Sequence, residues 1–221
     1  GRQTSASGDY STAMGFVATA SGTYSTAMGS STTASEWYST AMGAGTTASG
    51  QFSTAMGAYT TAQAYASTVL GRYNVISGTT DSWVATDPIF AIGIGSDSSN
   101  RANAMTVLKS GNVGIGPTSP ATKLHIDGDG GILAQGTYGS GWNGGSLGAG
   151  SRLMWIPSKA AFRAGYVDFT QWNTANIGDY SVAMGYRTTA SGLISTAMGA
   201  QTTATGTYST AMGYMATTSG V

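Results

Sequence analysis

A five-residue motif, Ser-Thr-Ala-Met-Gly, recurs along this chain at a fixed step. The copies at Ser11 and Ser25 lie 14 residues apart, and the later copies keep the same spacing within two blocks. They begin at Ser11, Ser25, Ser39 and Ser53, with a variant at Ser67, and resume at Ser181, Ser195 and Ser209. A second element, Thr-Ala-Ser-Gly or a close variant, runs in phase between them. A short fixed period of this kind is typical of a solenoid, in which each repeat stacks on the next.

The length of the repeat decides between kinds of solenoid. Fourteen residues hold two strands of about five residues and two tight turns, whereas a helical repeat needs about 34 residues. We therefore predict an all-β fold in which each repeat is one coil of a parallel β-roll. The glycines that recur at positions such as Gly15 and Gly22 are expected where the chain reverses, since a positive φ costs glycine little.

Alternation along a strand places the two kinds of repeated side chain on opposite faces. Thr12 and Met14 share one face, while Ser11 and Ala13 share the other. We predict that the methionine face is the core of each coil, because an unbranched thioether fills irregular gaps. The predicted coil core consists of Met14, Met28, Met42, Met56, Leu70, Met184, Met198 and Met212.

The small-residue face is predicted to pack against neighbouring chains, since it lets another backbone approach closely. Its rank of alanines comprises Ala13, Ala27, Ala41, Ala55, Ala183, Ala197 and Ala211. A roll this thin buries too little apolar surface to offset its ordering entropy, which also favours oligomerisation. The alternative is that this face is simply a hydrated strand surface.

The repeat divides the chain into three predicted regions: a β-roll block over residues 1–71, a β-rich inserted module over 72–178 and a second β-roll block over 179–221. The middle region is out of phase and holds most of the aliphatic and tryptophan residues. Its predicted strands are Ser82–Val84, Pro88–Ile94, Ala104–Leu108, Val113–Ile115, Lys123–Ile126, Gly131–Ala134, Leu153–Ile156 and Ala160–Arg163.

Composition argues against most chemistry. Nine basic residues balance nine acidic ones and charged residues make up 8% of the chain, so no basic surface for nucleic acid or an anionic membrane is expected. With no cysteine and a single histidine, His125, we expect no metal site and no cofactor. We predict that the protein is not an enzyme. A β-helical polysaccharide lyase or hydrolase is the alternative, but it needs paired acids, and the acids here are scattered.

The copies read Tyr-Ser-Thr-Ala-Met-Gly, and residues 180–185 read Tyr-Ser-Val-Ala-Met-Gly. Over residues 1–71 and 179–220 the sequence resembles the head repeats of YadA-like trimeric autotransporter adhesins. The resemblance implies a left-handed parallel β-roll that trimerises, on a cell surface or a virion fibre. The segment Met105–Ile126 resembles tail-fibre-like surface proteins that often end in a self-cleaving S74-type chaperone, although no such chaperone is visible in this chain.

These observations predict a structural and adhesive segment of an extracellular homotrimeric fibre that binds by surface contacts. Its partners would be two further copies of itself and a protein or glycan on a host surface. The tryptophans Trp142, Trp155 and Trp172, in or beside glycine-rich loops, are candidate binding residues, with packing as the alternative. A glycan- or ice-binding solenoid is the alternative function, weakened because neighbouring residues such as Thr32 and Thr33 point to opposite sides of a strand.

Overall fold

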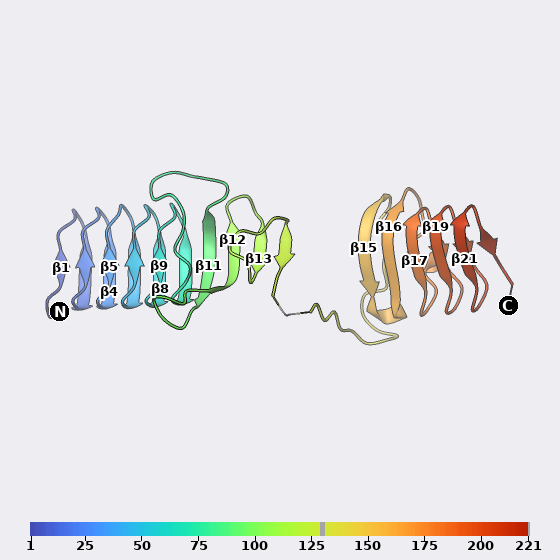
Figure 1. The fold of residues 1–221 in the computed structure, drawn as a ribbon, viewed down its shortest axis with the longest axis horizontal. Coiled ribbons are helices and arrows are strands. Elements are labelled where there is room, and N and C mark those ends of the chain that lie inside the picture. Colours follow the sequence, from blue (N-terminus) through green and yellow to red (C-terminus); the bar gives the residue numbers. More distant parts are fainter. Residues whose placement is uncertain (129–130, 221) are drawn as a thin grey trace. The chain divides into compact units, whose positions relative to one another are not determined.

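The computed structural model describes residues 1–128 and 131–220, and it divides the chain into two compact units, Gly1–Gly131 and Ile132–Val221. Each unit is a parallel β-roll extended by strands outside the repeat, and we call them the first roll and the second roll (Figure 1). Apart from two short 3-10 helices, η1 (Pro157–Lys159) and η2 (Thr174–Asn176), the regular structure of the described residues is β-strand. The predicted all-β solenoid is confirmed.

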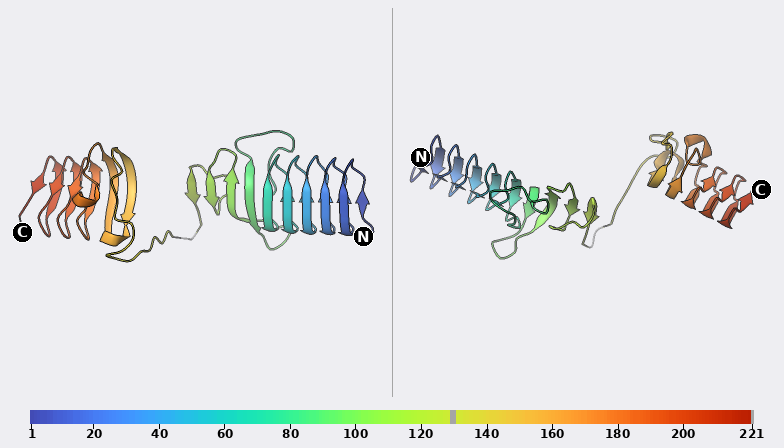
Figure 2. Two further views of the ribbon diagram at one scale, coloured as in Figure 1. Left: turned by 180° about the vertical axis from the view of Figure 1, so that it is seen from behind. Right: turned by 90° about the horizontal axis from the view of Figure 1, so that it is seen from above.

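Each repeat of the first roll supplies one five-residue strand and one two-residue strand, which stack into two separate parallel sheets (Figure 2). The long strands are β2 (Thr12–Phe16), β4 (Thr26–Ser30), β6 (Thr40–Ala44), β8 (Thr54–Ala58) and β10 (Thr68–Arg72). The short strands are β1 (Ser5–Ala6), β3 (Thr19–Ala20), β5 (Thr33–Ala34), β7 (Thr47–Ala48) and β9 (Thr61–Ala62). The prediction of two five-residue strands per coil is therefore wrong for one of them, because the two turns take up the remaining residues.

The turns are made largely by residues other than glycine. Tyr24 at one reversal has φ 58° and Ser31 at the other has φ 54°, both in the left-handed region, and equivalent positions in the other coils repeat these values. Gly15 does have a positive φ, 116°, but it lies inside β2 rather than in a turn. Gly22 is required for a different reason, since a Cβ there would lie 2.0 Å from the carbonyl oxygen of Glu36 in the next coil.

The faces of the long strands are the reverse of those predicted. The alanine rank is the core: Ala27, Ala41 and Ala55 have no exposed surface even in the single chain. The methionine rank points outward, with Met14 51% and Met212 61% exposed. Coils this thin leave room between their two sheets only for Ala, Ser and Thr, so the larger side chain must face out. Neither the predicted methionine core nor inter-chain packing through the alanines is therefore supported.

The predicted inserted module over residues 72–178 is not a separate fold. Its first half extends the long-strand sheet of the first roll through β11 (Pro88–Ile94), β12 (Asn103–Leu108), β13 (Val113–Ile115) and β14 (Leu124–Ile126). The strand β11 pairs in parallel with β10, and β12 runs antiparallel between β11 and β13. The result is a single nine-stranded sheet in the order β14-β13-β12-β11-β10-β8-β6-β4-β2.

The second half of that region begins the second roll. The strands β15 (Gly150–Ile156) and β16 (Ala161–Val167) form an antiparallel hairpin, and β16 pairs in parallel with β17 (Val182–Tyr186), followed by β19 (Thr196–Ala200) and β21 (Thr210–Tyr214). The short strands are β18 (Thr189–Ala190), β20 (Thr203–Ala204) and β22 (Thr217–Thr218). Of the predicted strands, Pro88–Ile94 and Val113–Ile115 are confirmed residue for residue, whereas Ser82–Val84 and Gly131–Ala134 are not strands.

Candidate functional site

An apolar rank runs across the outer face of the nine-stranded sheet of the first roll. In each repeat coil it is formed by methionine or leucine, and the strand register carries it through Ile92, Met105 and Ile115 beyond the repeats. Its members are Met14, Met28, Met42, Met56, Leu70, Ile92, Met105, Ile115 and Ile126. Met14, Met56 and Ile115 are among its members that the chain leaves exposed.

The neighbouring rank on the same face changes character along the sheet. In the repeat coils it is threonine, from Thr12 to Thr68. In β11 to β14 the same register position holds Phe90, Val107, Val113 and Leu124. The outer face is therefore half polar over the coils and wholly apolar over the strands that follow them. Contiguous exposed apolar surface of this kind marks an interaction site.

The second roll repeats this design. Its outer apolar rank consists of Leu153, Ala164, Met184, Met198 and Met212, and the neighbouring rank consists of Trp155, Phe162, Val182, Thr196 and Thr210. Leu153 is 76% exposed and Trp155 is 40% exposed. The repeat coils contribute Val182 and then threonine, whereas the strands outside the repeat contribute aromatic side chains.

The short-strand sheet offers a contrasting, hydroxyl-rich surface. Thr32 is fully buried while Thr33 lies partly exposed, which confirms that adjacent threonines point to opposite sides. The alternation leaves Thr33 and Ser35 on the outside with the buried Ala34 between them. This surface carries no rank of large apolar side chains, so the two outer faces of each roll differ sharply in polarity.

Aromatic side chains stack along the turn edge of the first roll. The rings of Tyr10, Tyr24, Tyr38 and Phe52 follow one another with centroids 4.8–5.1 Å apart and nearly parallel planes. All four occupy left-handed backbone positions, which costs a non-glycine residue roughly 1–2 kcal/mol each. The repeat reveals this rank in the sequence, but not that its rings stack at an exposed edge.

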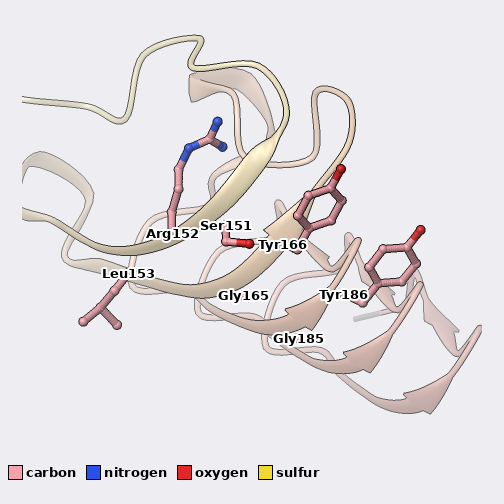
Figure 3. Close-up of a pocket in the computed structure, with 7 residues that line it drawn as sticks. All are labelled: Ser151, Arg152, Leu153, Gly165, Tyr166, Gly185 and Tyr186. Carbon is pink, nitrogen blue, oxygen red and sulfur yellow. The ribbon is translucent and has the colours of Figure 1, made fainter. Parts of the chain in front are cut away.

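An open groove of about 520 Å³ lies in the second roll where β15 begins and where β16 and β17 end (Figure 3). The rings of Tyr166 and Tyr186 stand side by side along it, with centroids 5.8 Å apart, and Gly165 and Gly185 form its floor. The guanidinium of Arg152 donates to three backbone carbonyls of residues 147–149, which fixes its position beside the groove. Flat rings over a bare backbone suit a flat, partly apolar ligand.

The three candidate tryptophans differ in their exposure to solvent. Trp172 is 2% exposed, and its indole N–H donates to the carbonyl oxygen of Thr188 at 2.9 Å, so it belongs to the core and cannot be a surface binding residue. Trp142 and Trp155 are 46% and 40% exposed. The sequence around the three tryptophans does not distinguish the buried one from the two exposed ones.

Side chains that could ligate a metal do not cluster within the described part of the chain. Among residues 1–128 and 131–220, no three His, Asp or Glu side chains come together as metal ligands. His125 lies in β14, where its Nδ1 accepts from the backbone N–H of Ala121. A hydrogen bond to Asp179 raises the pKa of the Tyr138 phenol well above its usual value, a structural effect at the surface. Over the same residues, neither short helix is long enough to cross a lipid bilayer.

Comparison with known families matches the repeat blocks. The model of the YadA head domain repeat matches residues 1–18, 6–32, 20–46, 34–60, 48–73, 177–202, 195–216 and 204–221. Together these matches span residues 1–73 and 177–221, which is more than half of the chain. The resemblance of Met105–Ile126 to tail-fibre-like proteins is not confirmed. No curated protein matches the chain.

Proposed function

Since the chain belongs to the family of YadA head domain repeats, we propose that it is a segment of a homotrimeric, adhesin-type extracellular fibre. YadA-type heads are surface-exposed and generally form homotrimers. The segment would act by presenting surfaces, without catalysis.

The observation that carries this proposal is the apolar outer face of the long-strand sheets. In the first roll Met14 and Met56 are exposed and Met28 and Met42 are half-buried, and in the second roll Met184 and Met212 are exposed. Within the repeat coils of both rolls the buried apolar residues are almost all alanine, so these coils gain little hydrophobic stabilisation from their own chain. Covering the methionine faces with those of two other copies would supply what the cores lack. This replaces the alanine face with the methionine face as the inter-chain surface.

Light scattering after size-exclusion chromatography tests the assembly. We expect the chain to elute with three times its mass of 22.2 kDa. Replacing Met42 and Met198 by Glu should give a monomer, because three carboxylates would meet at each position in the trimer interior. The matched control replaces Thr47 and Thr203 by Glu on the short-strand face and should remain trimeric. A monomeric parent chain at micromolar concentration, or equal loss of assembly in both variants, would contradict the proposal.

The groove at Tyr166 and Tyr186 supports a second candidate function, binding of a saccharide. Aromatic rings beside a glycine floor let a sugar ring lie flat against apolar surface while its hydroxyl groups reach the backbone. Replacing both tyrosines by Ala should weaken binding to a glycan array at least tenfold and should leave the trimer intact. Unchanged binding, or no glycan bound by the parent chain, excludes this second function and leaves the fibre proposal standing.

A further inference from the structure

Lys109 in the first roll has a buried side-chain amine without a hydrogen-bond partner among the described residues. It follows β12 directly, and its side chain has no exposed surface. Its Nζ lies 5.2 Å from the ring centroid of Trp83 and 5.7 Å from that of Tyr65. Within residues 1–128 and 131–220, Nζ makes no hydrogen bond. Lysine is almost never buried unless it is paired, so this arrangement calls for a specific role.

The group nearest in charge to that amine is the carboxyl of Asp87, the residue directly before β11. The two residues face each other across the end of the β11–β12 pair, where the N–H of Lys109 donates to the carbonyl oxygen of Asp87 at 2.9 Å. Between the side chains, Nζ and Oδ2 are 3.9 Å apart, which is too long for a hydrogen bond. The Asp87 side chain is 12% exposed, so both groups are largely withdrawn from water.

The surroundings of this pair favour attack of the amine on the carboxyl carbon. Desolvation lowers the pKa of the Lys109 amine, with the charge of Asp87 opposing the shift. A lowered pKa favours the neutral, nucleophilic amine. The backbone N–H of Thr79 donates to Oδ2 of Asp87 at 2.7 Å, where it would stabilise the negative oxygen of a tetrahedral intermediate. The side chain of Lys109 has no exposed surface and that of Asp87 is 12% exposed, and this low exposure to water slows the reverse hydrolysis.

We propose that Lys109 and Asp87 form an intramolecular isopeptide bond. The ammonium first gives a proton to the carboxylate, which leaves a neutral amine beside a carboxylic acid. Nζ then bonds to Cγ, the bond from Cγ to the hydroxyl oxygen breaks, and a second proton from nitrogen goes to that oxygen, which leaves as water. No oxidant, metal or co-reactant is needed. The product is an amide that joins the two side chains.

Such a bond would fasten the least regular part of the first roll. Residues 75–87 form a loop over the turn edge, held by backbone bonds from Tyr65 to Thr79 and from Gln51 to Thr80. An isopeptide bond would close the covalent ring formed by Asp87, β11, β12 and Lys109. Tension along the chain would then pass through the bond and leave residues 88–108 in place. The bond would lie within one chain, so its formation does not depend on trimer assembly.

Mass spectrometry of the denatured full chain tests the proposal. The intact mass should fall below the sequence mass by one water. Trypsin cleaves after Arg101 but not after an acylated lysine, so peptides 73–101 and 102–123 should be recovered as one linked species. Recovery of full mass together with the separate peptides 102–109 and 110–123 would overturn the proposal.

A matched variant separates this bond from another source of water loss. The Asp127-Gly128 sequence can cyclise to an imide, which also releases one water. Lys109→Arg keeps the cation between the two rings but cannot form the amide, so the full mass should return. Water loss that persists in Lys109→Arg would assign the missing water elsewhere and overturn the proposal.

Discussion

The last coil of the first roll and the first coil of the second roll each leave backbone groups without a neighbouring coil. In the first roll these groups include a hydrogen-bond donor, and in the second roll they include an acceptor. In the short-strand sheet each coil donates forward: the N–H of Thr47 reaches the carbonyl oxygen of Thr60 in the next coil at 2.8 Å. The first roll therefore ends on an N–H without a following coil, at Thr61. The second roll begins on a carbonyl without a preceding coil, at Thr188. Buried backbone groups need partners, so each end requires a different side chain.

The first roll closes its end with a carboxamide. Asn74 falls 14 residues after Thr60 and so occupies the register of the next coil. Its Oδ1 accepts from the N–H of Thr61 at 2.8 Å, and its Nδ2 donates to the carbonyl oxygen of Thr61 at 3.0 Å. An amide offers both a donor and an acceptor, so it replaces a peptide group of the missing strand. Asn103 repeats the device by accepting from the N–H of Val75.

The second roll closes its end with groups that only donate. The indole of Trp172 donates to the carbonyl oxygen of Thr188, and the guanidinium of Arg163 donates to the carbonyl oxygens of Ser181 and Ala190 at 2.9 Å each. Arg163 is paired with Ala183 in the inner rank and has no exposed surface. Burial lowers the pKa of its guanidinium to about 10. The direction of the hydrogen bonds in a parallel sheet therefore decides whether a donor or an acceptor side chain can terminate it.

Arg163→Ala is expected to have the largest effect on this comparison. It removes the guanidinium donors from the carbonyls of Ser181 and Ala190, which keep only the backbone N–H groups of Phe162 and Gly178 as donors. It also opens a cavity inside the coil, and the two losses together should lower the free energy of unfolding by about 4 kcal/mol. Hydrogen exchange should show faster opening over residues 161–218, with the first roll unchanged as an internal control. Arg163→Met fills much of the volume without supplying donors and should recover only part of the loss. Parent-like protection in Arg163→Met would mean that the guanidinium donors do not matter.

Trp172→Phe should cost about 3 kcal/mol. Part of this is the unpaired carbonyl of Thr188, and part is the volume lost with the second ring. Denaturant unfolding with exchange over β17 to β19 measures it. Trp142→Phe is the matched control, since Trp142 is 46% exposed, and it should change the free energy by less than about 0.5 kcal/mol. Equal effects in the two variants would show that the hydrogen bond from the Trp172 indole to Thr188 does not stabilise the end of the second roll.

Asn74→Ala at the end of the first roll should cost about 2 kcal/mol, because a buried N–H and a buried C=O both lose their partner. The expected signature is faster exchange of the Thr61 amide with no change in the second roll. Asn176→Ala removes one exposed hydrogen bond to Thr170 and serves as the control. If the Thr61 amide stayed protected in Asn74→Ala, another group would have to take over the cap.

The sequence predicts the coils well because every coil repeats the same 14-residue pattern. It does not settle which face is inside, since Ala13 and Met14 alternate equally well in either orientation. That choice depends on the distance between the two sheets of a coil, which the alternation of residues does not reveal. The general preference for large apolar side chains inside is overridden in a coil too thin to hold them.

The caps could not be predicted in the same way, because each occurs once. Asn74 keeps the 14-residue register but breaks the residue pattern, and that departure is the only signal in the sequence. Arg163 stands in a predicted strand with nothing to mark it as buried, since an arginine without an acidic partner is normally exposed. The turn tyrosines are visible as a rank, but their left-handed backbone is not, because β-turn statistics favour glycine or asparagine there.

The smallest expected effect concerns the turns that join the added strands. In the first roll, the turn between β11 and β12 is held by Asp97, whose carboxylate accepts from the side chain and backbone of Asn100 and from Ser96 and Ser99. In the second roll, the β15–β16 turn instead relies on the left-handed Ala160 and has no side-chain cap. Hydrogen bonding, first from the Asn100 side chain, lowers the pKa of Asp97 from 3.8 to about 2.

Because this pKa is depressed in the folded state, the contribution of Asp97 is present above about pH 3.8 and is lost as the pH falls through about 2. Asn100→Ala should therefore raise the pKa of Asp97 toward its usual value, read from the carboxyl carbon shift in an NMR titration. Exchange in β11 and β12 should stay at parent levels at neutral pH, since the turn is exposed and the remaining backbone donors persist. A pKa unchanged in Asn100→Ala would show that the Ser96 hydroxyl and the backbone N–H groups hold the carboxylate without the Asn100 side chain. Loss of protection in β12 would show that this turn, unlike its counterpart in the second roll, is needed to keep the added strands in place.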